Sequence, residues 1–145
     1  MKGDYRFVDH TADVEFVARG SSIEETFRNA FLALFDTALY VNKVARERSK
    51  AKRFEIKEEA AELEQLLWYV LQDTVSIMDS RSLFPYRIAN LEIKEKKNVY
   101  RFRAEIWARG QKAENAKLDI KGISRYGLKI SKKGKGFEAS VVMDV

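Results

Sequence analysis

Near one end of the chain, the segment Asp9-His10-Thr11-Ala12-Asp13 gathers residue types that could do chemistry. His10 beside two aspartates could act as a general base, although no nucleophile motif accompanies it. Aspartate oxygens would instead suit a hard cation such as Ca²⁺ or Mg²⁺. The third interpretation is a polar turn between two strands, because Asp and Thr side chains hydrogen-bond their own backbone. Taken alone, the segment favours the turn.

A second group of acidic oxygens is expected at the other end of the sequence. Apolar residues alternate along residues 137–145, which predicts a strand with Asp144 directed away from the apolar row. One residue later the sequence ends at Val145, whose carboxylate would add a second anionic donor. Alone, this pattern is also that of an ordinary acidic chain end.

Composition excludes several classes of chemistry. There is no cysteine and only one histidine, which excludes disulfides, thiolate catalysis, sulfur-rich zinc sites and multi-histidine metal sites. A chain with 46% hydrophobic and 34% charged residues is typical of a globular protein. We expect no membrane association, because no apolar run approaches the roughly 20 residues of a transmembrane helix. The N-terminal residues show no secretory apolar region, so we expect a cytoplasmic protein.

Basic and aromatic residues suggest possible contacts with RNA or protein. Trp107 alternates with Arg101, Arg103 and Arg109 on one face of a predicted strand, where it could stack on bases, anchor a protein interface, or lie beneath another layer of the same domain. Lysine-rich turns could touch phosphate, but such turns are usually solvated. The net charge of +5 permits contact with nucleic acid without requiring it. Gly134-Lys135-Gly136 lacks the spacing and the following helix of a phosphate loop.

Two helices are predicted to support these residues. The first starts at a Ser-x-x-Glu capping box provided by Ser21 or Ser22, and its apolar stripe runs from Ile23 to about Tyr40. The second is expected to open with three acids that suit a helix N-terminus, namely Glu58, Glu59 and Glu62. Its apolar stripe runs from Leu63 to Ile77, and the helix closes near Asp79-Ser80.

The rest of the chain reads as strands. The expected strands cover residues 5–8, 14–19, 54–56, 88–94, 99–109, 127–130 and 137–145, with hairpin turns near residues 96–98 and 132–136. No linker or internal repeat interrupts them. We therefore predict one α+β domain over residues 1–145, with a mostly antiparallel or mixed sheet packed against two helices.

Taken in order along the chain, these segments resemble the archease family. The family has an N-terminal aromatic strand leading into His-Thr-Ala-Asp, which matches His10 to Asp13. A capped helix containing Ala-x-x-Ala-Leu-Phe-Asp follows, approximated by residues 29–36. A Leu-rich helix then ends in an apolar-Asp turn at Ile77-Met78-Asp79, and the closing strand ends in Asp plus one aliphatic residue, Asp144-Val145. The resemblance covers nearly the whole chain.

This resemblance implies an accessory factor rather than an enzyme. It would activate an RtcB-type tRNA-splicing RNA ligase by speeding guanylylation of the ligase and allowing multiple turnovers, and RNA would be reached only through the ligase complex. The resemblance also implies a divalent cation, usually Ca²⁺, held by Asp13, Asp144 and the carboxylate of Val145. Family members often carry Lys-Ala-Val-Thr-Tyr-His before the last hairpin, whereas this chain has residues 121–126, Lys-Gly-Ile-Ser-Arg-Tyr. Any role of that histidine cannot be transferred, so contact with the ligase would differ in detail.

Two other functions compete with the activator. A small RNA-binding module would use Trp107, the arginines and the lysine turns, although recognition motifs of the common RNA-binding folds are absent. A small hydrolase would use His10 with Asp9 or Asp13, but it lacks a nucleophile. The sequence does not define the oligomeric state.

Overall fold

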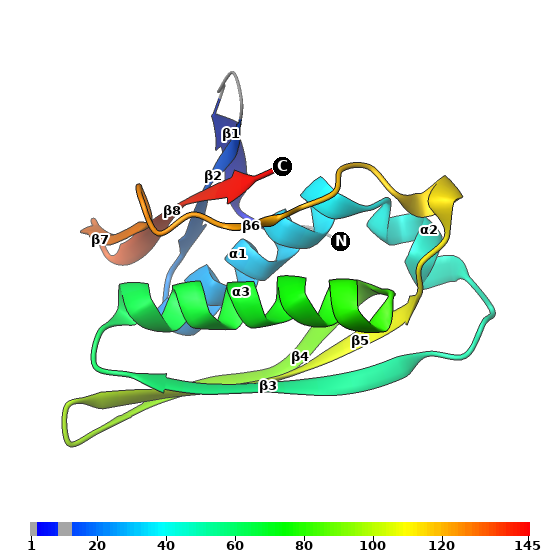
Figure 1. The fold of residues 1–145 in the computed structure, drawn as a ribbon. Coiled ribbons are helices and arrows are strands. Elements are labelled where there is room, and N and C mark those ends of the chain that lie inside the picture. The colour runs from blue at the N-terminus through cyan, green and yellow to red at the C-terminus, as the bar shows by residue number, and fades with distance from the viewer. Residues whose placement is uncertain (1–2, 9–12) are drawn as a thin grey trace.

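Two antiparallel sheets enclose a layer of helices (Figure 1). The computed structural model describes residues 3–8 and 13–145. Their strands are β1 (Tyr5–Val8), β2 (Asp13–Gly20), β3 (Lys52–Ala60), β4 (Leu83–Lys96), β5 (Val99–Gly110), β6 (Gly122–Ile123), β7 (Lys129–Lys133) and β8 (Gly136–Asp144). Their helices are α1 (Ile23–Ala38), α2 (Val41–Arg46) and α3 (Leu63–Arg81), with a 3₁₀ turn at Ala113–Asn115. The α+β prediction is confirmed.

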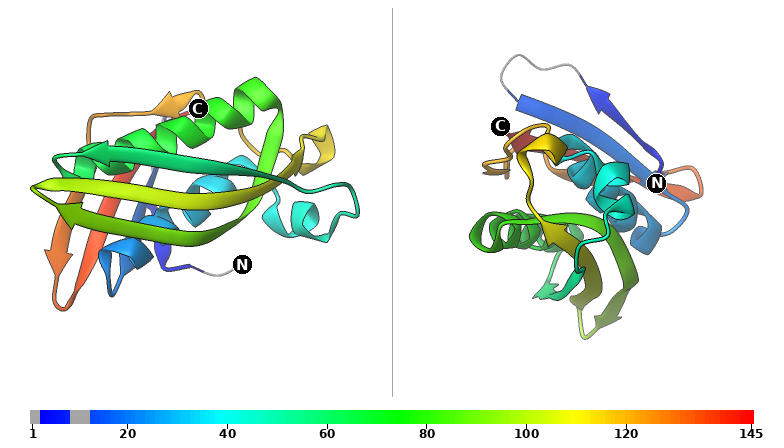
Figure 2. Two further views of the ribbon diagram at one scale, coloured as in Figure 1. Left: turned by 90° about the horizontal axis from the view of Figure 1, so that it is seen from below. Right: turned by 90° about the vertical axis from the view of Figure 1, so that its right-hand side faces the viewer.

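The five-stranded sheet joins the two ends of the chain. Its order is β1-β2-β8-β6, and β7 also pairs with β8. The three-stranded sheet has the order β3-β5-β4. Helix α1 packs on β2 and β8 of one sheet and on β4 of the other, while α3 packs on β3 and reaches β6 and β7. Figure 2 shows the two sheets on opposite sides of this helical layer.

Helix α1 begins at the predicted capping box. Ser22 is the N-cap, and its Oγ accepts a hydrogen bond from the Glu25 N–H at 3.1 Å. The Glu25 carboxylate in turn accepts hydrogen bonds from the N–H and hydroxyl of Ser21. Both serines therefore take part, which stabilises the first turn by satisfying free backbone donors.

The core lies between the helices and the inner faces of both sheets. Phe102 of β5 is 2% exposed, and its ring stacks on Phe31 of α1 with centroids 5.7 Å apart. Phe27 contacts the same ring from the preceding turn of α1, at 5.9 Å. The alternation predicted along β5 therefore places its apolar row in the core.

Three predictions about the elements were wrong. Glu58 and Glu59 belong to β3, not to the second helix, because the backbone ladder continues with Glu58 opposite Phe102 and Glu59 opposite Arg101. The helix begins only after Glu62. A single sheet was expected where there are two, and α2 was not predicted because six residues are too short for a clear helical period.

Candidate functional site

The two aspartates expected to bind a cation lie on neighbouring strands. Asp13 begins β2, Asp144 ends β8, and the antiparallel register makes them direct Cα partners. Residues opposite each other in such a pair point to the same face of the sheet, with Cβ atoms about 4.5–5.5 Å apart. The structure therefore brings together two acids from opposite ends of the sequence. Like charges placed in this way repel unless a cation or a proton lies between them.

Strand β6 fixes the other side of Asp144. Gly122 is the Cα partner of Asp144 on that side, so the residue opposite Asp144 carries no side chain. The Lys121 N–H donates a hydrogen bond to the Asp144 carbonyl oxygen at 2.8 Å. This bond engages the main-chain carbonyl oxygen of Asp144 and does not involve its side-chain carboxylate.

Helix α3 holds β6 in place through two polar side chains. The Trp68 indole N–H donates to the Ile123 carbonyl oxygen at 2.7 Å, and the Ile123 N–H donates to the Gln72 side-chain oxygen at 2.9 Å. Both backbone groups of Ile123 are thus satisfied by α3, because β6 is too short to form an extended ladder. The position of Gly122 beside Asp144 depends on this attachment.

The donor set suits a hard cation, provided that oxygens other than side-chain carboxylates take part. Across residues 3–8 and 13–145, no group of three or more Asp, Glu or His side chains gathers closely enough to hold a metal ion. Ca²⁺ takes six to eight oxygen ligands, so the Asp13 and Asp144 pair would need main-chain or terminal oxygens and water. The predicted third ligand, the carboxylate of Val145, is of this kind.

Part of the predicted site lies outside the described residues. This applies to Asp9, His10, Thr11 and Ala12, and therefore to the proposed roles of His10 as a base or as a turn residue. The segment that replaces Thr-Tyr-His of the family is described. Arg125 stacks over the Trp68 ring with its guanidinium carbon 4.1 Å from the ring centroid, and Tyr126 is 89% exposed.

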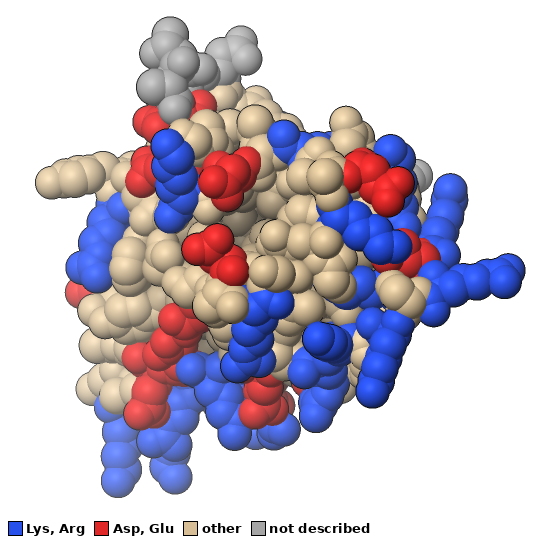
Figure 3. Space-filling model, turned by 45° about the vertical axis from the view of Figure 1, so that its right-hand side comes forward, with Lys and Arg blue, Asp and Glu red and all other residues tan. Residues whose placement is uncertain are grey.

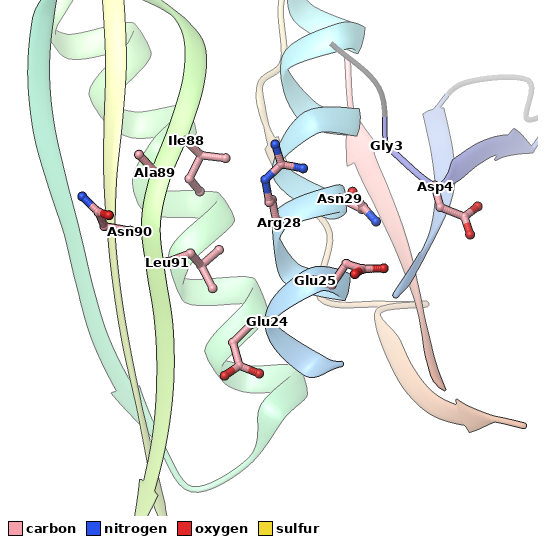
Figure 4. Close-up of a pocket in the computed structure, with 10 residues that line it drawn as sticks. All are labelled: Gly3, Asp4, Glu24, Glu25, Arg28, Asn29, Ile88, Ala89, Asn90 and Leu91. Atoms are coloured by element: carbon pink, nitrogen blue, oxygen red, sulfur yellow. The ribbon is translucent and has the colours of Figure 1, made fainter. Parts of the chain in front are cut away.

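A hollow of about 490 Å³ between α1 and the edge strand β4 contains acids and an arginine but is a poor candidate for a site (Figure 4). The Asn29 amide donates to the Arg19 carbonyl oxygen at 2.6 Å, and Glu25 is engaged in the helix cap. Two polar side chains of the hollow, those of Asn29 and Glu25, are thus already engaged in hydrogen bonds that stabilise the fold. Arg28 and Glu24 come from one face of α1 and are opposite in sign, so the hollow does not select one charge.

A carboxyl pair lies between β3 and α3. A hydrogen bond with Asp73, partial burial and the charge of Asp73 together raise the pKa of Glu58 to about 7. Glu58 shares the inward face of β3 with Phe54 and Ile56, and it is half-buried. The pair therefore holds a proton near neutral pH, which affects stability.

The outer face of the three-stranded sheet is not covered by another layer of the described chain. The side chains of Arg101 and Arg103 on this face are 64% and 55% exposed. Arg101 pairs with Glu59 and Arg103 with Glu55, both at 2.8 Å. Of the alternatives left open for Trp107, a covering layer is not seen among the described residues, so this part of the outer face faces solvent or a partner.

Comparison with known proteins agrees with this fold. The Archease protein family (MTH1598/TM1083) matches residues 5–145. Protein archease of Archaeoglobus fulgidus is 31% identical over 143 residues, covering 97% of this chain and 98% of the relative. Protein archease of Methanosarcina mazei is 29% identical over 145 residues, covering 97% and 95%.

Solved structures show the same architecture. The solution structure of Methanobacterium thermoautotrophicum protein 1598 covers 100% of both chains with a TM-score of 0.78 and 26% identity. A Thermotoga maritima crystal structure described as an archease and possible chaperone has a TM-score of 0.58 at 20% identity, covering 95% and 94%, which supports the fold alone. The fold and sequence together define a small α+β domain of the archease type. The chain belongs to the archease family.

No helix among the described residues is long and apolar enough to cross a membrane.

Proposed function

We propose that this protein activates an RtcB-type tRNA-splicing RNA ligase without catalysing a reaction itself. It would promote guanylylation of the ligase and allow each ligase molecule to turn over repeatedly. A divalent cation, most consistent with Ca²⁺, would be held by Asp13, Asp144 and the carboxylate of Val145. The cation would neutralise the repulsion between these acids and fix the ends of β2 and β8.

Two observations together carry the proposal. The family match extends over almost the whole chain, and the register places Asp13 directly opposite Asp144. On the other side of Asp144 the opposing residue is Gly122, which adds no competing side chain of its own. The lack of cysteine and of a phosphate loop in the sequence supports a non-catalytic role.

A ligase turnover assay tests the activator role. This protein is added at a small fraction of a molar equivalent to purified ligase, broken tRNA, nucleotide and metal. We expect many products per ligase with it and about one without it. The protein alone should modify neither RNA nor nucleotide. A requirement for equimolar amounts would contradict catalytic activation and would indicate a permanent subunit.

Matched variants connect activation to the paired acids. Asp13→Asn and Asp144→Asn should each reduce activation strongly. Asp119→Asn removes the same charge from an exposed position away from β2 and β8 and should leave activation unchanged. Equal loss in all three variants would separate activation from the proposed cation.

A further inference from the structure

A basic segment connects α2 to β3 on one side of the molecule. Over residues 46–53 it contains five positively charged side chains: Arg46, Arg48, Lys50, Lys52 and Arg53. The one acid among them, Glu47, is already bonded to Ser49, Lys112 and Asn115. The segment therefore carries a local excess of positive charge.

Arg109 fixes this segment against the three-stranded sheet. Its guanidinium donates to the carbonyl oxygens of Ser49 at 2.9 Å and Val44 at 2.8 Å. The same guanidinium stacks over the Tyr86 ring, 4.6 Å from the centroid. Because two carbonyl acceptors and an aromatic ring hold this guanidinium, the basic segment has a defined position rather than that of a loose loop.

The segment leads directly to Trp107 on the outer face of the sheet. Arg53 is the Cα partner of Trp107 on one side, and Arg87 of β4 is its partner on the other. Trp107 is half-buried between the two arginines, so part of its surface is open to solvent. Arg53 is balanced by Glu105 at 2.6 Å, whereas Arg87 is not.

Charge is distributed unevenly over the face. At the far end, Arg101 and Arg103 are neutralised by glutamates. Five cations make no side-chain hydrogen bond or ion pair with any residue that the structure describes: Arg46, Arg48, Lys50 and Lys52 of the basic segment, and Arg87 beside Trp107. Figure 3 brings this side of the molecule forward and shows Lys and Arg side chains gathered along its right and lower margins.

We propose that this basic patch, made of residues 46–53, Arg87 and Trp107, binds single-stranded RNA. Phosphates would contact the unpaired cations, and a base would stack on Trp107. Clustered free cations release counterions when they bind a polyanion. An aromatic ring between arginines on an open strand face adds the stacking platform typical of single-stranded nucleic acid binding. This goes beyond the proposed activation of the ligase, because it gives the protein its own contact with RNA.

The test measures RNA binding without the ligase. A fluorescein-labelled 20-nucleotide oligouridine is titrated with the full chain, and anisotropy is followed at several salt concentrations. Arg48→Gln/Lys50→Gln/Lys52→Gln should weaken binding about tenfold or more. It should also lower the slope of log K against log salt by about 2, since each phosphate contact with a single strand contributes about 0.7. The matched control, Lys132→Gln/Lys133→Gln/Lys135→Gln, removes the same three charges from the β7–β8 turn and should change affinity less than twofold.

Two further variants separate stacking from charge. Trp107→Leu should weaken binding about fivefold with the salt slope unchanged, and Arg87→Gln should lower the slope by about 0.7. Circular dichroism identifies the variants that remain folded. If Trp107→Leu does not fold, Arg87→Gln, a substitution at an exposed position, tests the same patch. Equal weakening by both triple variants would overturn the proposal, because it would show attraction by net charge alone. Tighter binding of polyglutamate, or of phosphatidylserine vesicles, than of RNA would also overturn it in favour of an acidic protein or a membrane surface.

Discussion

Replacing Glu58 with glutamine should stabilise the protein, although the substitution lies in a half-buried position. Glu58 of β3 and Asp73 of α3 share a proton, and their interaction raises the pKa of Glu58 from 4.5 to about 7. Glutamine keeps the shape and a hydrogen-bond donor toward Asp73 but removes the second negative charge. The substitution therefore tests whether this carboxyl pair opposes folding at neutral pH.

The sign follows from the raised pKa. Well below pH 4.5, Glu58 is protonated in both the folded and the unfolded chain, so its raised pKa does not lower the free energy of unfolding. As pH rises from 4.5 through about 7, the unfolded chain loses its proton first, so the folded state loses stability over this window. A rise from 4.5 to about 7 sets an upper limit of about 3.4 kcal/mol. Solvent screens a half-buried pair, so we expect about 1–2 kcal/mol at pH 8.

Thermal melting at pH 5 and pH 8 measures the effect. Glu58→Gln should raise the melting temperature by about 3–8 °C at pH 8, and the gain should be much smaller at pH 5. Glu59→Gln is the matched control, because its side chain lies on the outer face and pairs with Arg101 at 2.8 Å. It should change stability by less than about 1 kcal/mol at either pH. A Glu58→Gln gain that is equal at the two pH values, or a loss at pH 8, would refute the proton-sharing pair.

Three other substitutions test the core, the attachment of β6 and the cation. Phe102→Ala removes a buried ring stacked on Phe31 and should lower the free energy of unfolding, measured with urea, by about 3–5 kcal/mol. A loss below about 1 kcal/mol would contradict the packing. Trp68→Phe leaves the Ile123 carbonyl oxygen without its indole donor and should lower the free energy of unfolding by about 1–3 kcal/mol. Faster amide hydrogen exchange in β6 would show that the loss is local to this strand. Calcium at about 100 times its dissociation constant should stabilise the wild type by about 2.7 kcal/mol in melting experiments. Asp144→Asn or a C-terminal tag should reduce this stabilisation. An equal response in all forms would eliminate the site.

Much of the fold could be predicted because its signals are local. The alternation along β5 and the capping box of α1 each depend on residues a few positions apart, and both predictions were confirmed. The acids at the end of β3 misled the prediction because Glu58 and Glu59 suit a helix N-terminus as well as a strand. Pairing with β5 decided the outcome, and no local pattern contains that information.

The candidate site was predictable only through family resemblance. Asp13 and Asp144 are each ordinary in their own segments, and their register depends on how β2 meets β8. The role of α3 in holding β6 could not be read from the sequence, because Trp68 lies on a helix face that otherwise reads as a boundary between core and solvent. The basic segment after α2 was visible in the sequence as five cations within eight residues. Its importance emerged only from the structure, in which Arg53 pairs with Glu105 and the other four make no ion pair with any described residue.

The position of β8 has a consequence for the order of folding during synthesis. This strand leaves the ribosome after β1 to β7, yet it pairs with β2, β6 and β7. The three-stranded sheet contains only β3, β4 and β5, which emerge earlier and can pair while translation continues. The β1–β2 hairpin must then wait with one edge unpaired until β8 arrives, which makes it the part of the nascent chain most exposed to aggregation. A protein shortened before β8 would lack both the second aspartate and the strand that positions the first.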